Sequence, residues 1–349
     1  MDITNKIPVG VLGATGSVGQ KFIELLSNHP WFEVAEVAAS ERSAGNLYKD
    51  AVNWILSSPI PERIANLKVK NCMPDLDSKI VFSGLDSSVA GEIESEFAQK
   101  GYIVVSNSKN HRMDKDVPLL VPEINPSHLD LIKTQKYNGG CIVTNPNCST
   151  IGLVLALKPL YDNFGLDMVN VVTMQALSGA GYPGVSSLDI VDNVIPFISG
   201  EEVKLESEPL KILGDLNLHD IVNTNIKMSA QCNRVAVLDG HLECVQVKLK
   251  NKASEKDLID AWQNFSSAPQ ELNLPTAPVK PIYYFSEDKY PQPKIHRNLD
   301  KGMAVSVGRL RKDPLLDYKF IVLSHNTVRG AAGGAILCAE LMISKGYIK

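Results

Sequence analysis

Short apolar runs alternate with amphipathic stretches along the first 150 residues. Five of these runs are predicted to form buried strands: Ile7–Leu12, Val34–Ala38, Ile80–Phe82, Tyr102–Val105 and Cys141–Thr144. Two stretches, Ser17–Leu26 and Ala90–Gln99, are predicted to form helices. Strands that alternate with helices in this way predict a mostly parallel sheet that is covered on both faces.

From about residue 165 the apolar segments become longer and alternate with polar positions. Five more strands are predicted: Met168–Met174, Arg234–Leu238, Leu242–Leu249, Met303–Arg311 and Tyr318–Ser324. The dipeptide Asp239-Gly240 predicts a hairpin between the second and third of them. The proline-rich stretch Leu272–Pro293 predicts an extended connection, and a helix is expected over roughly Arg329–Ser344. This part of the chain predicts a second domain with an antiparallel or mixed sheet.

A glycine-rich turn lies between the first predicted strand and the first predicted helix. Its sequence is Gly13-Ala14-Thr15-Gly16-Ser17-Val18-Gly19. Glycines let the backbone approach a pyrophosphate, whose charge is met by free N–H groups at the start of the helix. The turn predicts a dinucleotide site, with Gly13, Thr15, Gly16, Ser17 and Val18 as contacts; a tight turn without a ligand is the alternative.

The residues after the second predicted strand indicate which dinucleotide binds. An acidic residue there would favour the ribose of NAD, but this chain has Ser40-Glu41-Arg42-Ser43. Two hydroxyls and a planar guanidinium suit a 2′-phosphate, so Ser40, Arg42 and Ser43 favour NADP. Glu41 fits this less well, unless it points away or accepts a ribose hydroxyl, and a solvated loop is the alternative.

Cys148 is the candidate nucleophile. It follows a sharp turn, Asn145-Pro146-Asn147, and precedes an apolar stretch that is compatible with a helix, 151–160. The N-terminus of a helix favours a thiolate, and its N–H groups can hold an oxyanion. A buried structural cysteine is the alternative, and the other five cysteines fit that description better.

A thiol beside a nicotinamide suggests a reaction in which an aldehyde and a thioester on that thiol are interconverted by hydride transfer. Such chemistry needs a proton-transfer partner, which is usually histidine. Of the seven histidines, His241 differs because it follows the Asp239-Gly240 turn, and Arg234 lies at the other end of the same apolar segment. A surface histidine in a hairpin is the alternative.

Charge and composition remove several classes of function. The 349 residues carry a net charge of -4, which disfavours a general binder of nucleic acid. No apolar run approaches the roughly 18 residues of a membrane helix. The six cysteines form no CxxC pair, which argues against a metal site or a disulfide scaffold. Since the first residues also lack the apolar core of a signal peptide, we expect a cytoplasmic protein without metal, membrane or nucleic-acid partners.

Six segments together resemble the aspartate-semialdehyde dehydrogenase family, in its archaeal and fungal branch. The resemblance covers nearly the whole chain, and its segments occur in the order 13–19, 39–45, 145–150, 175–181, 232–241 and 325–333. It implies an NADPH-dependent reductive dephosphorylation of L-aspartyl-4-phosphate to L-aspartate 4-semialdehyde, in the biosynthesis of lysine, threonine and methionine.

The resemblance also implies roles for individual residues. Cys148 matches the nucleophile that forms the thioester, His241 the acid/base and Gln175 a residue that orients the substrate. The implied substrate and phosphate contacts are Arg112, Asn147, Glu201, Lys204 and Arg234, although Glu202 or Glu208 could take the acidic role. Asn326 and Thr327 match residues on the nicotinamide side of NADP. Three cations for a phosphorylated substrate and one carboxylate for its ammonium group agree with this chemistry.

Three other functions remain open at this stage. Malonyl-CoA reductase has the same machinery, and N-acetyl-glutamyl-phosphate reductase is more distant. A regulatory protein that binds NADP without catalysis would require an unreactive Cys148.

The fold class predicted from these observations is α/β. A Rossmann-like, NADP-binding domain is expected from residues 1–147 and 327–349, with an inserted α+β catalytic and dimerisation domain, 148–326, that contains a mixed sheet. The exposed strands of that sheet would need a cover, so a homodimer or homotetramer is expected.

Overall fold

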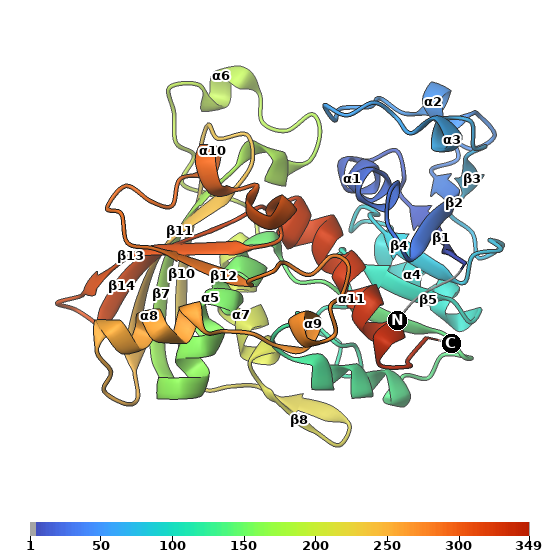
Figure 1. Ribbon diagram of the computed structural model, residues 1–349. Helices are drawn as coiled ribbons and strands as arrows, with labels where there is room; N and C mark the ends of the chain where they lie inside the picture. The colour runs from blue at the N-terminus through green and yellow to red at the C-terminus, as the bar shows by residue number, and fades with distance from the viewer. Residues whose placement is uncertain (1–4, 349) are drawn as a thin grey trace.

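The first sheet is parallel throughout and has six strands. The computed structural model describes residues 5–348. In this sheet β1 pairs on one side with β2 and on the other with β4, and the strand order is β3-β2-β1-β4-β5-β6 (Figure 1). The strands are β1 (Ile7–Leu12), β2 (Phe32–Ala39), β3 (Lys70–Asn71), β4 (Ile80–Ser83), β5 (Ile103–Ser106) and β6 (Cys141–Thr144). This order confirms the prediction of a doubly wound, Rossmann-like sheet.

Helices cover both faces of this sheet. They are α1 (Ser17–Leu26), the short α2 (Tyr48–Ala51) and α3 (Glu62–Ala65), α4 (Ala90–Gln99) and α11 (Gly333–Ser344). Figure 1 shows α11 between the two halves of the molecule. Its residues 333–343 are all buried, and its apolar side chains share one core with Val9, Phe22 and Phe82 of the first sheet and its helix α1. A 3₁₀ segment, Pro126–Thr134, precedes β6.

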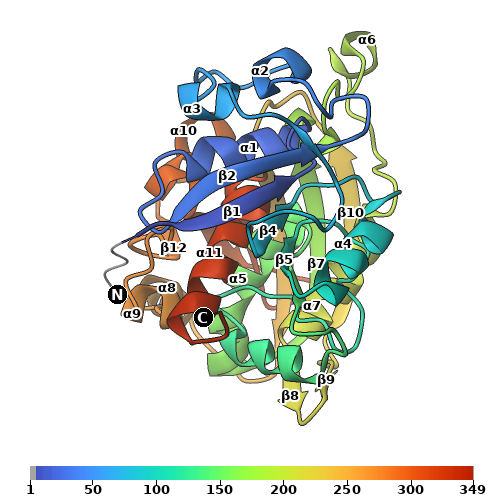
Figure 2. The ribbon, with the colours of Figure 1, turned by 90° about the vertical axis from the view of Figure 1, so that its right-hand side faces the viewer.

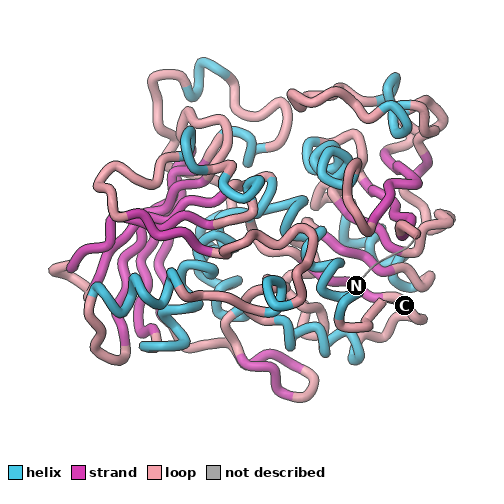
Figure 3. Tube along the Cα trace, viewed as in Figure 1, coloured by secondary structure: helices cyan, strands magenta, loops and turns pink. Residues whose placement is uncertain are grey.

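The second sheet is mixed, as predicted, and also has six strands. Its order is β10-β7-β11-β14-β13-β12, with parallel pairs at both edges and antiparallel pairs between them. Figure 3 shows its strands side by side, in magenta, at the left of the molecule. The strands are β7 (Leu166–Gln175), β10 (Lys227–Arg234), β11 (His241–Leu249), β12 (Ile282–Phe285), β13 (Val305–Lys312) and β14 (Tyr318–Ser324).

Two long helices pack against the second sheet. Helix α5 (Cys148–Phe164) is buried along most of its length, and α8 (Glu255–Gln263) places Trp262 in the same core. Helix α7 (Glu201–Ile212) packs against α5 and β10. The remaining elements are short: α6 (Ser187–Ile190), β8 (Asp215–Asn217), β9 (Asp220–Val222), α9 (Ala268–Glu271), α10 (Pro293–His296) and the 3₁₀ turns Leu177–Ala180 and Leu299–Gly302. In residues 5–348 we find no helix with the length and apolar character needed to cross a bilayer.

The predicted hairpin between 234–238 and 242–249 is wrong. Strands β10 and β11 lie on opposite sides of β7, so they do not pair with each other. The segment that joins them continues along the end of β7, where the N–H of Val235 donates to Gln175 O at 3.0 Å. Gly240 does adopt a left-handed conformation (φ 98°). The Asp-Gly turn therefore starts β11 after a crossover instead of closing a hairpin.

The proline-rich stretch 272–293 is not wholly an extended connection. It contains the edge strand β12, which pairs in parallel with β13. The tyrosines and Phe285 of β12 favour a strand, but the prolines around this segment had favoured an extended connection.

The chain passes between the two sheets twice. It leaves the first sheet, which faces the viewer in Figure 2, after β6 through residues 145–147 and enters α5. It returns after β14 through 325–327 and a π turn, Val328–Ala332, that leads into α11. These two crossings correspond to the predicted domain boundaries, but the exact boundaries stay a prediction.

Candidate active site

Cys148 is the first residue of α5, beside the first crossing. The side chain of Asn147 caps the helix, because its Oδ1 accepts from the N–H groups of Ser149 (3.0 Å) and Thr150 (3.3 Å). The π turn lies against the other side of Cys148: a Cβ placed on Gly330 would be 2.8 Å from the Cys148 Cβ. Cys148 is thus held between the capped start of α5 and the backbone of Gly330, which has no side chain.

His241 lies directly against the thiol. It begins β11 and is fully buried, and its Nε2 is 3.1 Å from Cys148 Sγ. The other ring nitrogen, Nδ1, accepts a hydrogen bond from the N–H of Ala176 at 3.0 Å. The carbonyl of the same residue accepts from Arg234 Nη1 at 2.7 Å, so Ala176 orients both the imidazole and the guanidinium.

Burial favours the neutral forms of both groups. It raises the pKa of Cys148 to about 12, and the nearby Glu201 carboxylate adds to this effect. Burial also lowers the pKa of His241 to about 3, assisted by the charge of Arg234. The start of α5 favours the thiolate of Cys148, whereas burial opposes it.

Glu201 collects hydrogen bonds at the centre of the site. It is at the start of α7, and its carboxylate accepts from Asn147 Nδ2 (2.9 and 3.1 Å) and Gln175 Nε2 (3.3 Å) and pairs with Lys204 (2.5 Å). Burial acts to raise the pKa of Glu201, but Lys204 and the two amides outweigh it and keep the pKa below its usual value.

The two other acidic candidates have different partners. Glu208 pairs with Arg112 at 2.9 Å, and its second oxygen accepts from the N–H of Asn147 at 2.7 Å. Glu202 instead accepts from the backbone of Cys232 in β10. Glu201 and Glu208 therefore both bind Asn147 beside the thiol, whereas Glu202 binds the backbone of the edge strand β10.

A cavity of about 340 Å³ joins these residues to the first sheet. It is lined by residues of both halves of the molecule, among them Ser17, Val18, Arg112, Asn147, Cys148, Glu201, Lys204, Asn326 and Thr327. The candidate nucleophile and the start of the glycine-turn helix thus face one space. Within that space Asn326 also braces the turns around it, accepting from the N–H of Gly240 and donating to Ser178 Oγ, each at 2.8 Å.

The glycine turn has the close packing of a phosphate cradle. A Cβ on Gly19 would be 2.2 Å from Gly13 O, and Gly13 has a left-handed φ of 70°. Gly16 precedes α1, and no side chain caps the first turn of that helix. The free N–H groups at Ser17 and Val18 fit a dinucleotide pyrophosphate.

A second cavity, of about 390 Å³, is lined by two of the three residues expected at a 2′-phosphate, Arg42 and Ser43, but not by Ser40. Thr15 of the glycine turn also lines it, together with Asn46, Asn53 and Tyr182. Ser40 and Glu41 are exposed at the end of β2, and Arg42 is also exposed. The guanidinium is therefore free to meet an anionic group of the cofactor.

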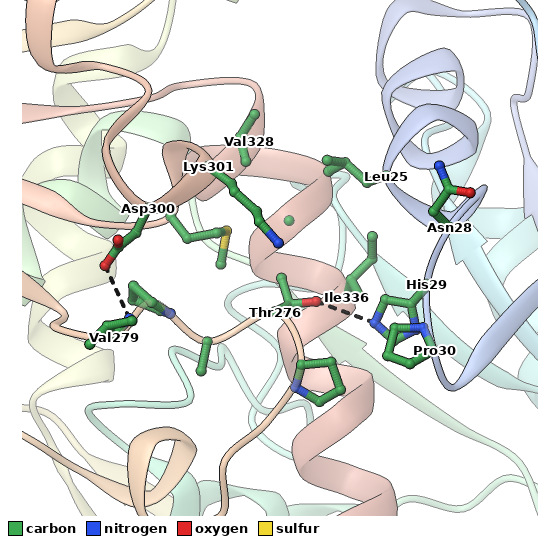
Figure 4. Close-up of a pocket in the computed structure, with 15 residues that line it drawn as sticks. Leu25, Asn28, His29, Pro30, Thr276, Val279, Asp300, Lys301, Val328 and Ile336 are labelled. Carbon is green, nitrogen blue, oxygen red and sulfur yellow. Dashed lines mark hydrogen bonds between the residues drawn. The ribbon is translucent and has the colours of Figure 1, made fainter. Parts of the chain in front are cut away.

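A further cavity, of about 380 Å³, lies on the far side of the π turn (Figure 4). Val328 and Gly333 line it, whereas Thr327, Gly330 and Ala331 line the cavity that holds Cys148. The π turn is therefore a wall that these two cavities share.

Two features of the site escaped sequence reasoning. The first is the peptide of Ala176, which acts through backbone atoms that every residue except proline offers. The second is the pairing of Glu208 with Arg112, since an acidic residue in a charged helix gives no signal of a partner 96 residues away.

Comparison with known proteins identifies the family. Residues 8–132 match the NAD binding domain of semialdehyde dehydrogenase, and residues 157–329 match its dimerisation domain. The aspartate-semialdehyde dehydrogenase of Archaeoglobus fulgidus is 52% identical over 97% of this chain and 99% of its own length. The chain belongs to the aspartate-semialdehyde dehydrogenase family. The enzyme of Schizosaccharomyces pombe is 51% identical over the same shares of the two chains.

Solved structures agree with the membership. The aspartate-semialdehyde dehydrogenase of Candida albicans, determined with NADP, has a TM-score of 0.91 at 45% identity and covers 99% of this chain and 100% of its own. The sequence-based resemblance to the archaeal and fungal branch of the aspartate-semialdehyde dehydrogenases is confirmed. The chain is thus an oxidoreductase of this family, and it includes the domain through which the family forms homo-oligomers.

Proposed function

We propose that this aspartate-semialdehyde dehydrogenase reduces L-aspartyl-4-phosphate to L-aspartate 4-semialdehyde with NADPH and releases phosphate. The observation that carries the proposal is the 3.1 Å contact of Cys148 Sγ with His241 Nε2, beside a cavity that Cys148 lines and that also reaches the start of α1. The names of the archaeal and fungal relatives, and the NADP of the Candida albicans structure, support the substrate and the cofactor.

Cys148 is the nucleophile of this reaction. Its sulfur attacks the acyl carbon, the C–O bond to the phosphate breaks, and a thioester remains on the enzyme. Arg112, Lys204 and Asn147 bind the phosphate as it leaves. NADPH supplies the hydride that reduces the thioester. His241 is the partner of the sulfur in both steps.

The remaining charged residues bind the amino-acid part of the substrate. Arg234 takes the α-carboxylate through its planar guanidinium, and Glu201 takes the ammonium group. Gln175 donates to Glu201 at 3.3 Å, which places it where it can orient the acyl group near the thiol.

Cofactor contacts extend along the first sheet. The pyrophosphate binds at Gly13, Thr15, Gly16, Ser17 and Val18, and the 2′-phosphate at Ser40, Arg42 and Ser43. Asn326 and Thr327 hold the nicotinamide side. In this scheme the NADP-binding domain comprises 1–147 and 327–349, and the catalytic and dimerisation domain comprises 148–326, in a cytoplasmic homodimer or homotetramer that serves lysine, threonine and methionine synthesis.

The test is phosphate-dependent formation of NADPH from aspartate semialdehyde. Cys148→Ser should lower turnover by on the order of 10³-fold or more and leave NADPH binding unchanged, since the thiol and the glycine turn are on different elements. Cys244→Ser is the matched control and should keep full activity. Near wild-type turnover of Cys148→Ser would contradict the proposal, and so would activity with malonyl-CoA in place of the aspartyl substrate.

A further inference from the structure

We infer that Lys211 is a positioning residue of the phosphate site: its ammonium group holds the loop 112–117 against α7 and thereby places Arg112. Lys211 is buried near the end of α7 and is not among the residues that line the cavity beside Cys148. It therefore acts on the substrate only through Arg112. This role rests on the proposed function, in which Arg112 binds the phosphate.

The first observation is the set of acceptors around the Lys211 ammonium group. Its Nζ donates to the carbonyl oxygens of Asp114 at 2.7 Å, Arg112 at 2.8 Å and Val117 at 2.9 Å. An ammonium group has three protons and no lone pair, so these three bonds use its entire capacity. Lys211 therefore serves this one loop and no other segment of the chain.

The second observation is that the ammonium group keeps its charge at neutral pH. Burial lowers the pKa of Lys211 to about 8, which is still above neutrality. Four nearby carboxylates oppose this effect of burial on the pKa, those of Asp114, Asp116, Asp220 and Glu208. The three carbonyl oxygens also favour the charged form, because a neutral amine has only two N–H groups and would turn its lone pair toward the third oxygen. All three donors are therefore present at pH 7.

The third observation is that the backbone of the loop 112–117 makes only long hydrogen bonds within itself and with its neighbours. The loop consists of turns, in which three N–H groups donate to the carbonyl three residues earlier, at 3.2 or 3.3 Å. From outside the loop, the side chain of Gln135 reaches a fourth carbonyl, that of Asp116, at 2.9 Å. The three bonds from Lys211 are shorter than the turns' own bonds, and they attach the loop to α7.

The fourth observation concerns the spacing of charged residues along α7. Four of them are three or four positions apart and share one face of the helix: Glu201, Lys204, Glu208 and Lys211. The first two are proposed contacts of the substrate. The second two hold Arg112, whose guanidinium is 2.9 Å from Glu208 and whose carbonyl is 2.8 Å from Lys211. One helix face therefore sets the position of Arg112 relative to Lys204, the other cation proposed for the phosphate.

The consequence is a role that is specific to phosphate. Without the three bonds from Lys211 the loop can move away from α7, and Arg112 moves with it. Cys148 and the glycine turn lie on other elements and stay in place. Phosphate binding should therefore weaken, whereas the binding of aspartate semialdehyde and of NADP should not.

The kinetic test uses the full-length enzyme in the direction that consumes aspartate semialdehyde, NADP and phosphate. Lys211→Met keeps a long unbranched side chain but has no ammonium group. We expect a rise of roughly 10-fold in KM for phosphate, with kcat and the other two KM values within about 2-fold of the wild type. Lys115→Met is the matched control, because it removes one charge from an exposed position of the same loop, and its KM for phosphate should not change. An unchanged KM for phosphate in folded Lys211→Met would overturn the inference.

A double variant tests whether Lys211 acts through Arg112. Arg112→Ala should itself raise KM for phosphate. Adding Lys211→Met to Arg112→Ala should raise it no further, because both changes remove the same contact with phosphate. Additive effects would mean that Lys211 attracts phosphate by its own charge, which would overturn the positioning role.

The third test needs no substrate and is independent of the proposed function. Hydrogen exchange of the backbone, followed by mass spectrometry, compares the free wild type with Lys211→Met. We expect the amides of residues 108–117 to exchange roughly 10-fold faster in the variant, and those of β5 to keep their rates. Equal rates in the loop would overturn the inference, whereas a wild type without phosphate-dependent activity would contradict only the proposed function. If Lys211→Met does not fold, Lys211→Gln takes its place, since an amide keeps two of the three N–H donors and should show smaller changes in the same direction.

Discussion

Arg329 and Glu123 form a bidentate ion pair that solvent does not reach, with nitrogen–oxygen distances of 2.7 and 2.5 Å. Arg329 belongs to the π turn, and the next residue, Gly330, lies against Cys148. Glu123 belongs to the loop between β5 and the 3₁₀ segment Pro126–Thr134. The pair therefore anchors the second crossing of the chain to the first sheet, directly behind the nucleophile.

Glu123→Ala should lower the free energy of unfolding by about 3–5 kcal/mol, because it leaves an unpaired cation in the core. Replacing both partners, with Glu123→Leu and Arg329→Met, should cost less than the single change. Urea denaturation measures both losses. Asp260→Ala, which breaks an exposed pair with Lys256, is the control and should have no measurable effect. A loss in Glu123→Ala no larger than this control would refute the expectation.

Gly330→Ala should slow the reaction of Cys148 with a thiol-specific alkylating agent. The new methyl group would lie 2.8–2.9 Å from the Cβ, Cα and carbonyl oxygen of Cys148, so the nucleophile must move. Gly91→Ala is the matched control, because there the added Cβ meets only the end of the Asn110 side chain. Equal alkylation rates in the wild type and Gly330→Ala would mean that the turn does not set the position of the thiol.

Arg42→Ala should raise KM for NADPH by roughly 10-fold and leave KM for NADH unchanged. The reason is that a guanidinium facing the cofactor cavity stabilises a 2′-phosphate, which only NADPH carries. Arg63→Ala is the control, since Arg63 is an exposed arginine that bonds the outer side of β2. An equal rise in KM for NADPH and for NADH would mean that Arg42 contacts a part of the molecule that the two cofactors share.

His128→Gln should make stability less sensitive to acid. Burial lowers the pKa of His128 to about 4, with Nε2 3.1 Å from Gly214 O. Between the unfolded pKa of about 6.5 and this folded value, only the unfolded chain takes up the proton. Stability therefore falls as the pH falls through this range, by about 1.4 kcal/mol per pH unit for each such group.

Urea denaturation across this pH range measures the slope, which should be shallower in His128→Gln by one proton. His219→Gln, at an exposed position, should keep the wild-type slope. An unchanged slope in His128→Gln would show that this histidine is already protonated in the folded protein.

The sequence predicted most of the first sheet because each of its central strands is a short, continuous apolar run. It predicted the start of α5 because the sharp turn Asn145-Pro146-Asn147 precedes an apolar stretch; the structure adds that the side chain of Asn147 caps this helix. It failed at β10 and β11, since Asp239-Gly240 reports a local turn while the pairing of each strand with β7 is decided by contacts distant in sequence.

In the candidate site, too, the sequence indicated local chemistry but not contacts between segments that are distant in sequence. Side chains with specific chemistry, such as Cys148 and Arg234, could be proposed from the sequence and its family resemblance. The peptide of Ala176 could not, because its contribution comes from backbone atoms and depends on where β7 ends. The partners of Glu208 could not be predicted either, since Arg112 and Asn147 approach it only after α7 has docked.

The position of α11 has a consequence for synthesis on the ribosome. All strands of the first sheet have left the exit tunnel long before this helix is translated, yet its apolar residues complete the core beneath them. The nascent sheet must therefore wait, with the part of its apolar face that α1 does not cover exposed, while the entire second sheet is made. That interval is when we expect this chain to depend most on chaperones.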